Sequence, residues 1–283
     1  IELDFNEEVG PESGYLPGGI GYYKKDFNVP ASYKGKRVSI VFDGIYHKAT
    51  IYLNGQEVDY HRYGYTSFET DLTPYLKYGG KNTLSVKVDH SEKSRWYTGS
   101  GIYRHVWMQV TNPIHVKMWG TYITTPRVSA ESAIVSCVAN TSALTGEIEI
   151  MQRIVDAQGN LLKINGKQYA ARTEVVMPEN GTKDIAQSFT LSNPQLWNLE
   201  KPYLYRLETI LKQKGKVIDR YTTRFGVRTI GFDKDKGFFL NGKNIKMKGA
   251  CLHQDAGCLG VAVPNRSYER RLTILKEFGA NAI

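Results

Sequence analysis

Alternating apolar and polar residues dominate the chain from Tyr22 to about Arg224. Four such stretches carry the apolar positions Val38-Ile40-Phe42, Ala49-Ile51-Leu53, Leu84-Val86-Val88 and Tyr203-Tyr205-Leu207. Successive side chains of a β-strand point to opposite faces of the sheet, so this pattern predicts strands with one buried face. Asn54-Gly55 lies after one of these stretches and is typical of a tight hairpin turn. The pattern therefore predicts a mostly β chain built from antiparallel sandwiches.

Thr111-Asn112-Pro113 marks the expected boundary between two blocks of strands. Residues 1–111 form the first domain, in which periodicity is weak up to about residue 21. Residues 112–224 form the second domain, which has many predicted strands and no convincing helix. Such a block suits an immunoglobulin-like β-sandwich, although the Cys…Trp…Cys pattern of antibody domains does not occur in it.

The periodicity changes after Phe225. A hairpin is predicted around Asn241-Gly242, and a helix is predicted at Ser267–Phe278, with Ser267 as its N-cap. Gly279 is placed to end the helix, and Ala280–Ile283 is expected to begin another strand. A strand, a loop, a helix and a new strand make one βα unit. Since one such unit cannot bury its own faces, we expect most of a third domain to lie outside this chain.

The composition excludes several classes of protein. Hydrophobic residues make up 41% and charged residues 23%, which is an ordinary globular balance. The sequence contains no run of about 18 apolar residues, so no membrane span is predicted. The formal charge is +9, but the basic residues stand in short groups at predicted turns, such as Lys34–Arg37. We interpret them as solvated hairpin tips, not as a nucleic-acid surface. Ile1–Asp4 has no features of a signal peptide, and both periplasm and cytoplasm stay open.

The cysteines do not predict a disulfide framework. Cys137, Cys251 and Cys258 are an odd number without framework spacing. His253 lies between the last two cysteines, but zinc sites usually contain two close ligand pairs, so we predict no metal site. Cys137 stands in an alternating stretch and is expected to be a small buried hydrophobe.

Six segments, in order, resemble glycoside hydrolase family 2, the family of β-galactosidases, β-glucuronidases and β-mannosidases. They are Gly18–Pro30, Phe42–Ile45 with Ala49–Gly55, Arg95–Arg104, Leu196-Trp197 with Pro202–Tyr205, Phe225–Arg228, and Asn241–His253. The resemblance implies that residues 1–111 are a jelly-roll domain truncated at its N-terminus. It implies an immunoglobulin-like sandwich at residues 112–224 and the first segment of an incomplete (β/α)8 barrel at residues 225–283.

The resemblance also implies a function. The chain would be the N-terminal part of a retaining exo-β-glycosidase, with β-galactosidase favoured, which hydrolyses terminal β-linked sugars of carbohydrates. Family catalysis uses two glutamates on later barrel strands. Glu269 and Glu277 lie on the predicted helix and match neither, so the chain contains no catalytic residue and should be inactive alone. A stand-alone carbohydrate-binding or adhesion module is the alternative, although the segment from Phe225 to His253 counts against it.

Four residues are candidates for substrate binding. His253 and Asp255 follow the first predicted barrel strand, at the end where barrel active sites form. Arg95 and Trp96 lie in a loop that reaches the barrel mouth in the family, and an aromatic face can stack on a sugar. His253 bonded inside its loop, a solvated Asp255 and interdomain packing of Trp96 are the alternatives.

Other positions qualify this prediction. Ser94-Arg95 stands where family β-galactosidases carry an acidic sodium ligand, so no cofactor is predicted. A sodium or magnesium ion in a longer enzyme stays open, as does a homo-oligomer. Arg104 is expected to form an ion pair or to hold a loop.

The predicted helix has an apolar face without barrel neighbours, so it must dock on a sandwich, self-associate or fray. We expect residues 250–283 to be less ordered than residues 22–224. Limited proteolysis followed by mass spectrometry should therefore detect the first cleavage within residues 250–283. Equal protection of both regions would contradict this.

Overall fold

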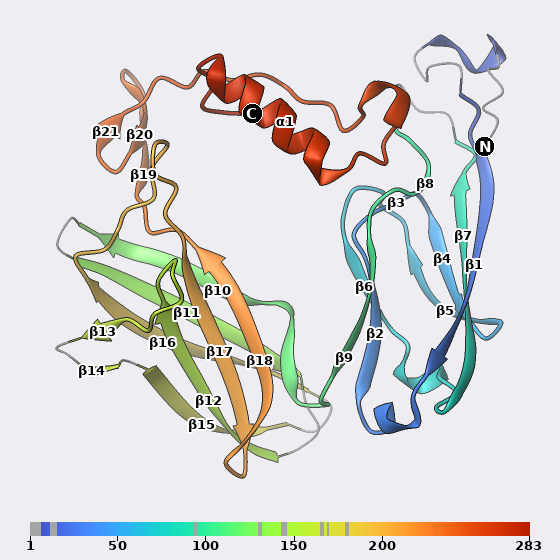
Figure 1. The fold of residues 1–283 in the computed structure, drawn as a ribbon, viewed down its shortest axis with the longest axis horizontal. Coiled ribbons are helices and arrows are strands. Elements are labelled where there is room, and N and C mark those ends of the chain that lie inside the picture. The colour runs from blue at the N-terminus through green and yellow to red at the C-terminus, as the bar shows by residue number, and fades with distance from the viewer. Residues whose placement is uncertain are drawn as a thin grey trace. The chain divides into compact units, whose positions relative to one another are not determined.

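The computed structural model describes residues 7–11, 16–92, 96–129, 132–142, 146–164, 167–168, 170–178 and 181–283. The chain is mostly β, as predicted, and its backbone divides into two compact units (Figure 1). Unit 1 contains Ile1–Val110, Ala250–Asn281 and Ile283, and unit 2 contains Thr111–Gly249 and Ala282. None of the helices in the described ranges is long and apolar enough to cross a membrane.

Unit 1 is built around two antiparallel sheets. The first has the order β1-β7-β4-β5, with the bounds Gly19–Val29, Gly80–His90, Ala49–Leu53 and Gln56–His61. The second has the order β6-β2-β9, with the bounds Phe68–Asp71, Arg37–Phe42 and Val106–Thr111. A short pair joins β3 (Ile45–Tyr46) to β8 (Gly101–Ile102). Short 3-10 turns occur at Glu7–Val9, Ala31–Tyr33, Thr73–Tyr75 and Gly257–Leu259 (η5).

The core of unit 1 comes from the alternating positions. Ile51 on β4 pairs with Val86 on β7, and both are buried. Phe42 on β2 stacks on Phe68 of β6, with ring centroids 5.1 Å apart. These residues belong to one cluster of buried side chains between the two sheets. On β4 and β7 the alternation separates a buried face from a more exposed one, as the sequence pattern predicts, whereas β2 is buried on both faces from Val38 to Phe42.

Unit 2 contains a three-stranded and a four-stranded sheet. The first has the order β10-β11-β16, with the bounds His115–Val128, Ser132–Ser142 and Thr182–Ser192. The second has the order β15-β12-β17-β18, with the bounds Ala170–Met177, Gly146–Val155, Tyr205–Gln213 and Lys216–Phe225. Smaller sheets contain β13 (Lys163–Ile164) with β14 (Lys167–Gln168), and β19 (Ile230–Asp233), β20 (Gly237–Leu240) and β21 (Lys243–Asn244).

Two buried clusters fill the space between the sheets of unit 2. Phe189 of β16 packs in one cluster with Leu207 of β17, and Ile185 of β16 packs in the other with Leu211 of β17. The sandwich expected at residues 112–224 therefore has strands of both sheets around its core. The side chain of Cys137 lies outside the described part, so its expected burial stays a prediction.

The predicted turns occur. Asn54 and Gly55 have φ angles of 53° and 87°, and Asn241 and Gly242 have 51° and 76°. Both positions of such a turn need a positive φ, which Asn and Gly tolerate best. Asn54 also joins neighbouring strands, because its Nδ2 donates to Asn82 Oδ1 at 2.9 Å.

The one α-helix of the described ranges, α1, covers Asn265–Glu277. The prediction of Ser267 as its N-cap is wrong. Pro264 occupies the N-cap position, and Ser267 lies inside the first turn, where its N–H donates to the Pro264 carbonyl at 2.9 Å. Proline favours a helix start because it has a fixed φ and no N–H to leave unpaired. Gly279 follows the helix with a φ of 85°, as expected.

Residues 225–283 are the segment expected to begin a barrel. Gly249 and Ala282 form an isolated parallel bridge, on either side of the loop and α1. Phe278 of the predicted apolar face is 90% exposed, and no residue of α1 is buried. The barrel at residues 225–283 therefore stays a prediction.

The buried core predicts a stability difference between two Leu→Ala substitutions in unit 1. Leu53 is fully buried, so Leu53→Ala should lower the free energy of unfolding by about 2–5 kcal/mol. Leu272→Ala on the solvated side of α1 is the matched control and should change it by less than about 0.5 kcal/mol. Urea unfolding followed by circular dichroism measures both. Equal effects would contradict this account of the core.

Candidate substrate-binding loop

The predicted substrate-binding residues lie in unit 1, on two loops. His253 is exposed and Asp255 is half-buried, in the irregular segment before η5. Trp96 is 52% exposed in the loop before β8. Arg95, like Ser94, lies outside the described residues, so its proposed role stays a prediction.

One hydrogen bond joins these two loops through the neighbours of the predicted residues. Gln254, next to His253, donates from Nε2 to the backbone carbonyl of Tyr97 at 3.2 Å, and Tyr97 directly follows Trp96. The same Nε2 donates to the Tyr65 hydroxyl at 3.3 Å. The structure therefore brings together two segments that the sequence analysis singled out separately. Gln254 and Tyr65 escaped that analysis because Gln and Tyr carry no motif of their own, and Tyr97 entered it only as part of the segment Arg95–Arg104.

Side chains of helix α1 bind backbone carbonyls of the same loop. The Tyr268 hydroxyl donates to the Gln254 carbonyl at 2.9 Å, and Arg271 Nη1 donates to the Asp255 carbonyl at 2.9 Å. Both donors lie on α1, one turn or less apart, so one stretch of helix holds two successive carbonyls.

Two buried valines dock the following residues on the sandwich. Val261 and Val263 are 6% and 3% exposed. A Cβ atom on Gly99 would collide with the Val261 side chain, and one on Gly260 would lie 2.7 Å from the Tyr97 hydroxyl. Both glycines have positive φ angles, 75° and 55°. The close approach therefore requires glycine on each side.

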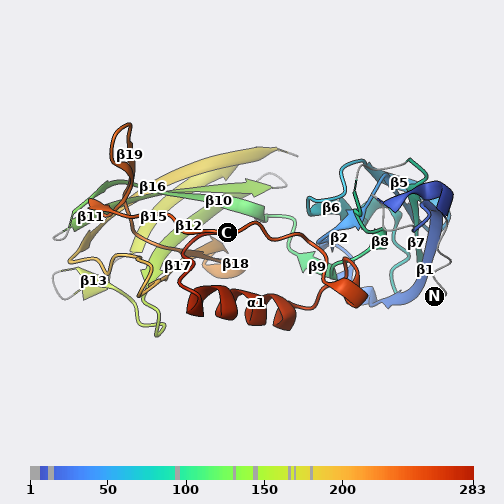
Figure 2. The ribbon, with the colours of Figure 1, turned by 90° about the horizontal axis from the view of Figure 1, so that it is seen from above.

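Arg104 holds the end of this segment, as expected. Its Nη1 donates to the Val263 carbonyl and its Nη2 donates to Asn265 Oδ1, both at 3.4 Å. The segment from Gln254 to Asn265, which we call the docked segment, is thus bound to the sandwich at both ends. Figure 1 places the short coil of η5 at the end of the unit that carries β3 and β8, and Figure 2 shows the same coil beside the start of α1. Because the docked segment is bound to the sandwich, we expect the first protease cleavage in the exposed residues of α1 or in the residues that follow it.

Several aromatic side chains of unit 1 have pKa values that are shifted by burial. Burial is the first cause that raises the pKa of Tyr65 to about 12, and burial also raises the pKa of Tyr97 and Tyr103. Burial lowers the pKa of His47 and His90, whose rings meet edge to face at 5.5 Å. Low dielectric disfavours the charged form of each group. Burial therefore favours the uncharged form of each of these rings, while the charged groups Asp255 and Arg104 act on Tyr97 and Tyr103 from close by.

The loop offers an imidazole and a carboxylate for hydrogen bonds but lacks a metal-binding cluster. No group of three His, Cys, Asp or Glu residues in the described ranges could hold a metal ion. Cys251 and Cys258 are both exposed. Hydrogen bonding to hydroxyl groups is the chemistry that this loop can perform.

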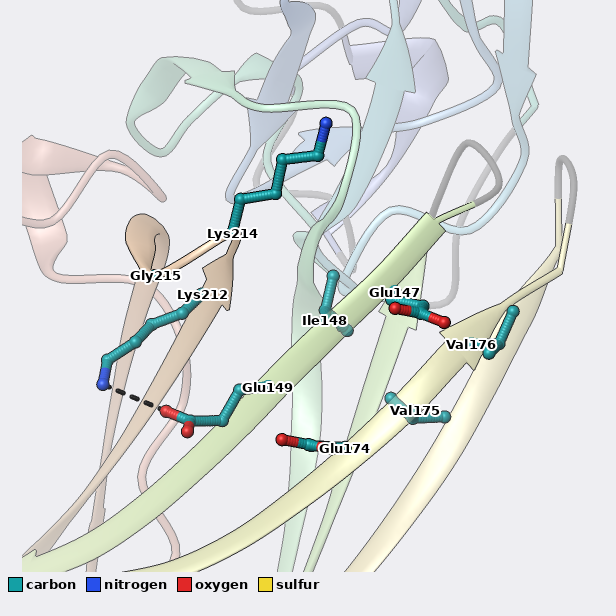
Figure 3. A pocket seen from close by; sticks show the side chains of 9 residues that line it. All are labelled: Glu147, Ile148, Glu149, Glu174, Val175, Val176, Lys212, Lys214 and Gly215. Atoms are coloured by element: carbon teal, nitrogen blue, oxygen red, sulfur yellow. Dashed lines mark ion pairs between the residues drawn. The ribbon is translucent and has the colours of Figure 1, made fainter.

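A separate hollow of about 540 Å³ lies in unit 2, on strands β12, β15 and β17 (Figure 3). Glu149 pairs across the sheet with Glu174 on one side and Lys212 on the other, and Lys212 Nζ lies 3.0 Å from the Glu149 carboxylate. None of the predicted substrate-binding residues lines it. Its charged groups Lys212 and Glu149 pair with each other, and it lies in the other unit from the predicted residues, so we assign it no role in the site.

Two family models match the chain. The model described as "Glycosyl hydrolases family 2, sugar binding domain" matches residues 13–113, and "Glycosyl hydrolases family 2" matches residues 114–228. Their order and their near-continuous coverage agree with the two sandwiches. The chain belongs to glycosyl hydrolase family 2, as the portion that carries these two domains.

Curated relatives include two kinds of enzyme. The chain is 43% identical to the beta-galactosidase BoGH2A of Bacteroides ovatus, over 100% of this chain and 33% of the relative. It is 36% identical to a putative beta-glucuronidase of Formosa agariphila, over 98% of this chain and 26% of the relative. The chain therefore spans about a third or less of the length of these relatives.

Solved structures agree with the fold. A glycosyl hydrolase family 2 member from Bacteroides cellulosilyticus superposes with a TM-score of 0.92 at 37% identity, over 99% of this chain and 36% of that chain. A beta-glycosidase from Bacteroides vulgatus gives a TM-score of 0.90 at 34% identity, over 99% of this chain and 35% of that chain.

The raised pKa of Tyr65 predicts a loss of stability in alkali. The unfolded tyrosine ionises near pH 10 and the folded one near pH 12, so the unfolded state binds fewer protons between these values. The stability contributed by protonated Tyr65 is complete below about pH 10 and is lost as the pH rises to about 12.

Tyr65→Phe should therefore reduce the fall in Tm between pH 9 and pH 12 by about 2–4 °C, after allowance for solvent screening. Differential scanning fluorimetry across this range measures the slope. Tyr22→Phe, at a side chain that is 76% exposed, is the matched control. An unchanged slope in Tyr65→Phe would count against a buried, neutral hydroxyl.

Proposed function

We propose that the chain is the part of a retaining exo-β-glycosidase that carries the sugar-binding domain, the following sandwich and the first loop of the active site. The observation that supports this most is the match of both family 2 domains in sequence, together with relatives named as glycosidases along the whole chain. Terminal β-linked sugars are the proposed substrates.

The proposed roles follow from the loop. The His253 imidazole donates to or accepts from a sugar hydroxyl, and the Asp255 carboxylate accepts from one. Trp96 is half-exposed and offers an aromatic face for the C–H groups of a sugar ring. These contacts would orient the sugar and would strengthen as the transition state forms.

We assign the two catalytic carboxylates to a part of the enzyme outside these 283 residues. Retaining hydrolysis needs two carboxyl groups about 5–5.5 Å apart, one as nucleophile and one as acid and base. Glu269 and Glu277 are poor candidates, since both lie on α1 and Glu269 pairs with Arg266 at 3.1 Å. The chain alone should then hydrolyse nothing.

We propose a β-galactoside as the substrate in preference to a β-glucuronide. The support is that the 43% identical relative is named a beta-galactosidase, whereas the 36% identical relative is named a putative beta-glucuronidase. The description of residues 13–113 as a sugar binding domain also supports a second candidate, a carbohydrate-binding role for the chain by itself.

Turnover of aryl glycosides tests the proposal. The purified 283-residue chain should release no aryl group from a β-galactoside or a β-glucuronide. The longer polypeptide that contains it should hydrolyse the β-galactoside with the higher kcat/KM. His253→Ala should lower this value by about 10- to 100-fold, the cost of one or two hydrogen bonds in a closed site.

His105→Ala is the matched control, because His105 is exposed in the same unit and contacts Asp43 instead of the loop. It should leave kcat/KM within about twofold of wild type. Hydrolysis by the 283-residue chain, or a longer polypeptide that is inactive on both glycosides, would overturn the proposal. Sugar affinity of the inactive chain, measured by calorimetry, would favour the second candidate.

A further inference from the structure

Gln254 lies between the two residues of the loop to which we assign sugar contacts, yet its own side chain bonds to the sandwich. We infer that Gln254 is a positioning residue, which orients His253 and Asp255 by fastening their loop to Tyr65 and Tyr97. This inference rests on the proposed function, because the sugar contacts are what give its two neighbours a part in turnover.

The hydrogen bonds of Gln254 have a defined direction. Its amide NH2 group has two N–H donors, and the Tyr65 hydroxyl and the Tyr97 carbonyl accept them at 3.3 Å and 3.2 Å. The Tyr65 hydroxyl donates its own hydrogen to the Thr98 carbonyl at 3.3 Å. A tyrosine hydroxyl is protonated at neutral pH, and burial raises the pKa of Tyr65 further. A carboxylate at position 254 would have no hydrogen for either acceptor.

The loop is held from a second side by α1. Tyr268 and Arg271 bind the carbonyls of Gln254 and Asp255, each at 2.9 Å. The side chain of Gln254 therefore faces the sandwich while the backbone around it is bound to the helix. A loop held on both sides keeps its neighbouring side chains in one arrangement, which binding sites need to within about 0.5 Å.

The bond to Tyr97 also relates the two groups of predicted sugar contacts to each other. Trp96 precedes Tyr97 and His253 precedes Gln254, so each lies one residue from the same hydrogen bond. The distance between the stacking surface and the hydrogen-bonding imidazole then depends on this bond. Its loss should weaken substrate binding and also slow the chemical step.

Hydrogen exchange on the 283-residue chain tests the fastening without any need for activity. Gln254→Glu removes both donors at nearly constant volume and should speed exchange of the backbone amides in residues 252–263 by about tenfold. Tyr65→Phe removes one acceptor and should give roughly a threefold increase. If Gln254→Glu fails to fold, Tyr65→Phe still tests the inference.

Two controls match these changes. Gln56→Glu is the same substitution at an exposed position. Tyr78→Phe removes a hydroxyl that donates to the Thr73 carbonyl elsewhere in the sandwich. Neither should alter exchange in residues 252–263. Unchanged exchange in Gln254→Glu and in Tyr65→Phe would overturn the inference, whether or not the longer polypeptide is active.

A double-mutant cycle in the longer polypeptide separates positioning from a general loss of structure. Gln254→Glu should lower kcat/KM for an aryl β-galactoside by about 10- to 100-fold. In a His253→Ala background the same change should cost at least about threefold less than in the wild type, because only Asp255 is then left to position.

Additive losses in the cycle would overturn the positioning role. Faster exchange in a longer polypeptide that is inactive on both glycosides would overturn the proposed function, and the role in turnover with it. Faster exchange together with a non-additive cycle supports the inference.

Discussion

The docked segment from Gln254 to Asn265 is the part of unit 1 on which the candidate site depends. Val261 and Val263 are buried, Val261 lies against Gly99, and Gly99 and Gly260 permit the close approach. Burial of a valine side chain contributes about 1.5–3 kcal/mol, so both residues stabilise the attachment. Without it, the loop with His253 and Asp255 would have only the short helix α1 for support.

The polar contacts of this segment select its arrangement. Apolar burial has little directionality, so two valines alone would tolerate small shifts along the sandwich. Gln254 and Arg104 bind specific oxygens at the two ends, and an unpaired buried polar group costs about 1–3 kcal/mol. A shift of the segment would break these bonds. Burial therefore holds the segment in place, and hydrogen bonds fix its register, as a binding loop on a rigid scaffold requires.

The two sandwiches are common to relatives named as galactosidases and glucuronidases. The scaffold therefore supports more than one sugar specificity, which is consistent with a site whose selecting groups lie on loops. Within this chain, the scaffold carries the loops with His253, Asp255 and Trp96, the residues that we propose to contact sugar. The hollow on β12, β15 and β17 is lined by none of these residues.

The sequence by itself determined the strands, the hairpin turns and the family, because these depend on local features: alternation with a period of two, positive φ angles at Asn-Gly, and short ordered motifs. The local pattern predicted the wrong N-cap, because α1 begins after Pro264 and Ser267 lies inside its first turn. Only the tertiary structure joined Gln254 to Tyr97 and Tyr65, which are 157 and 189 residues away along the chain. Such a contact has no local signature, since it depends on how both segments pack against the same end of the sandwich.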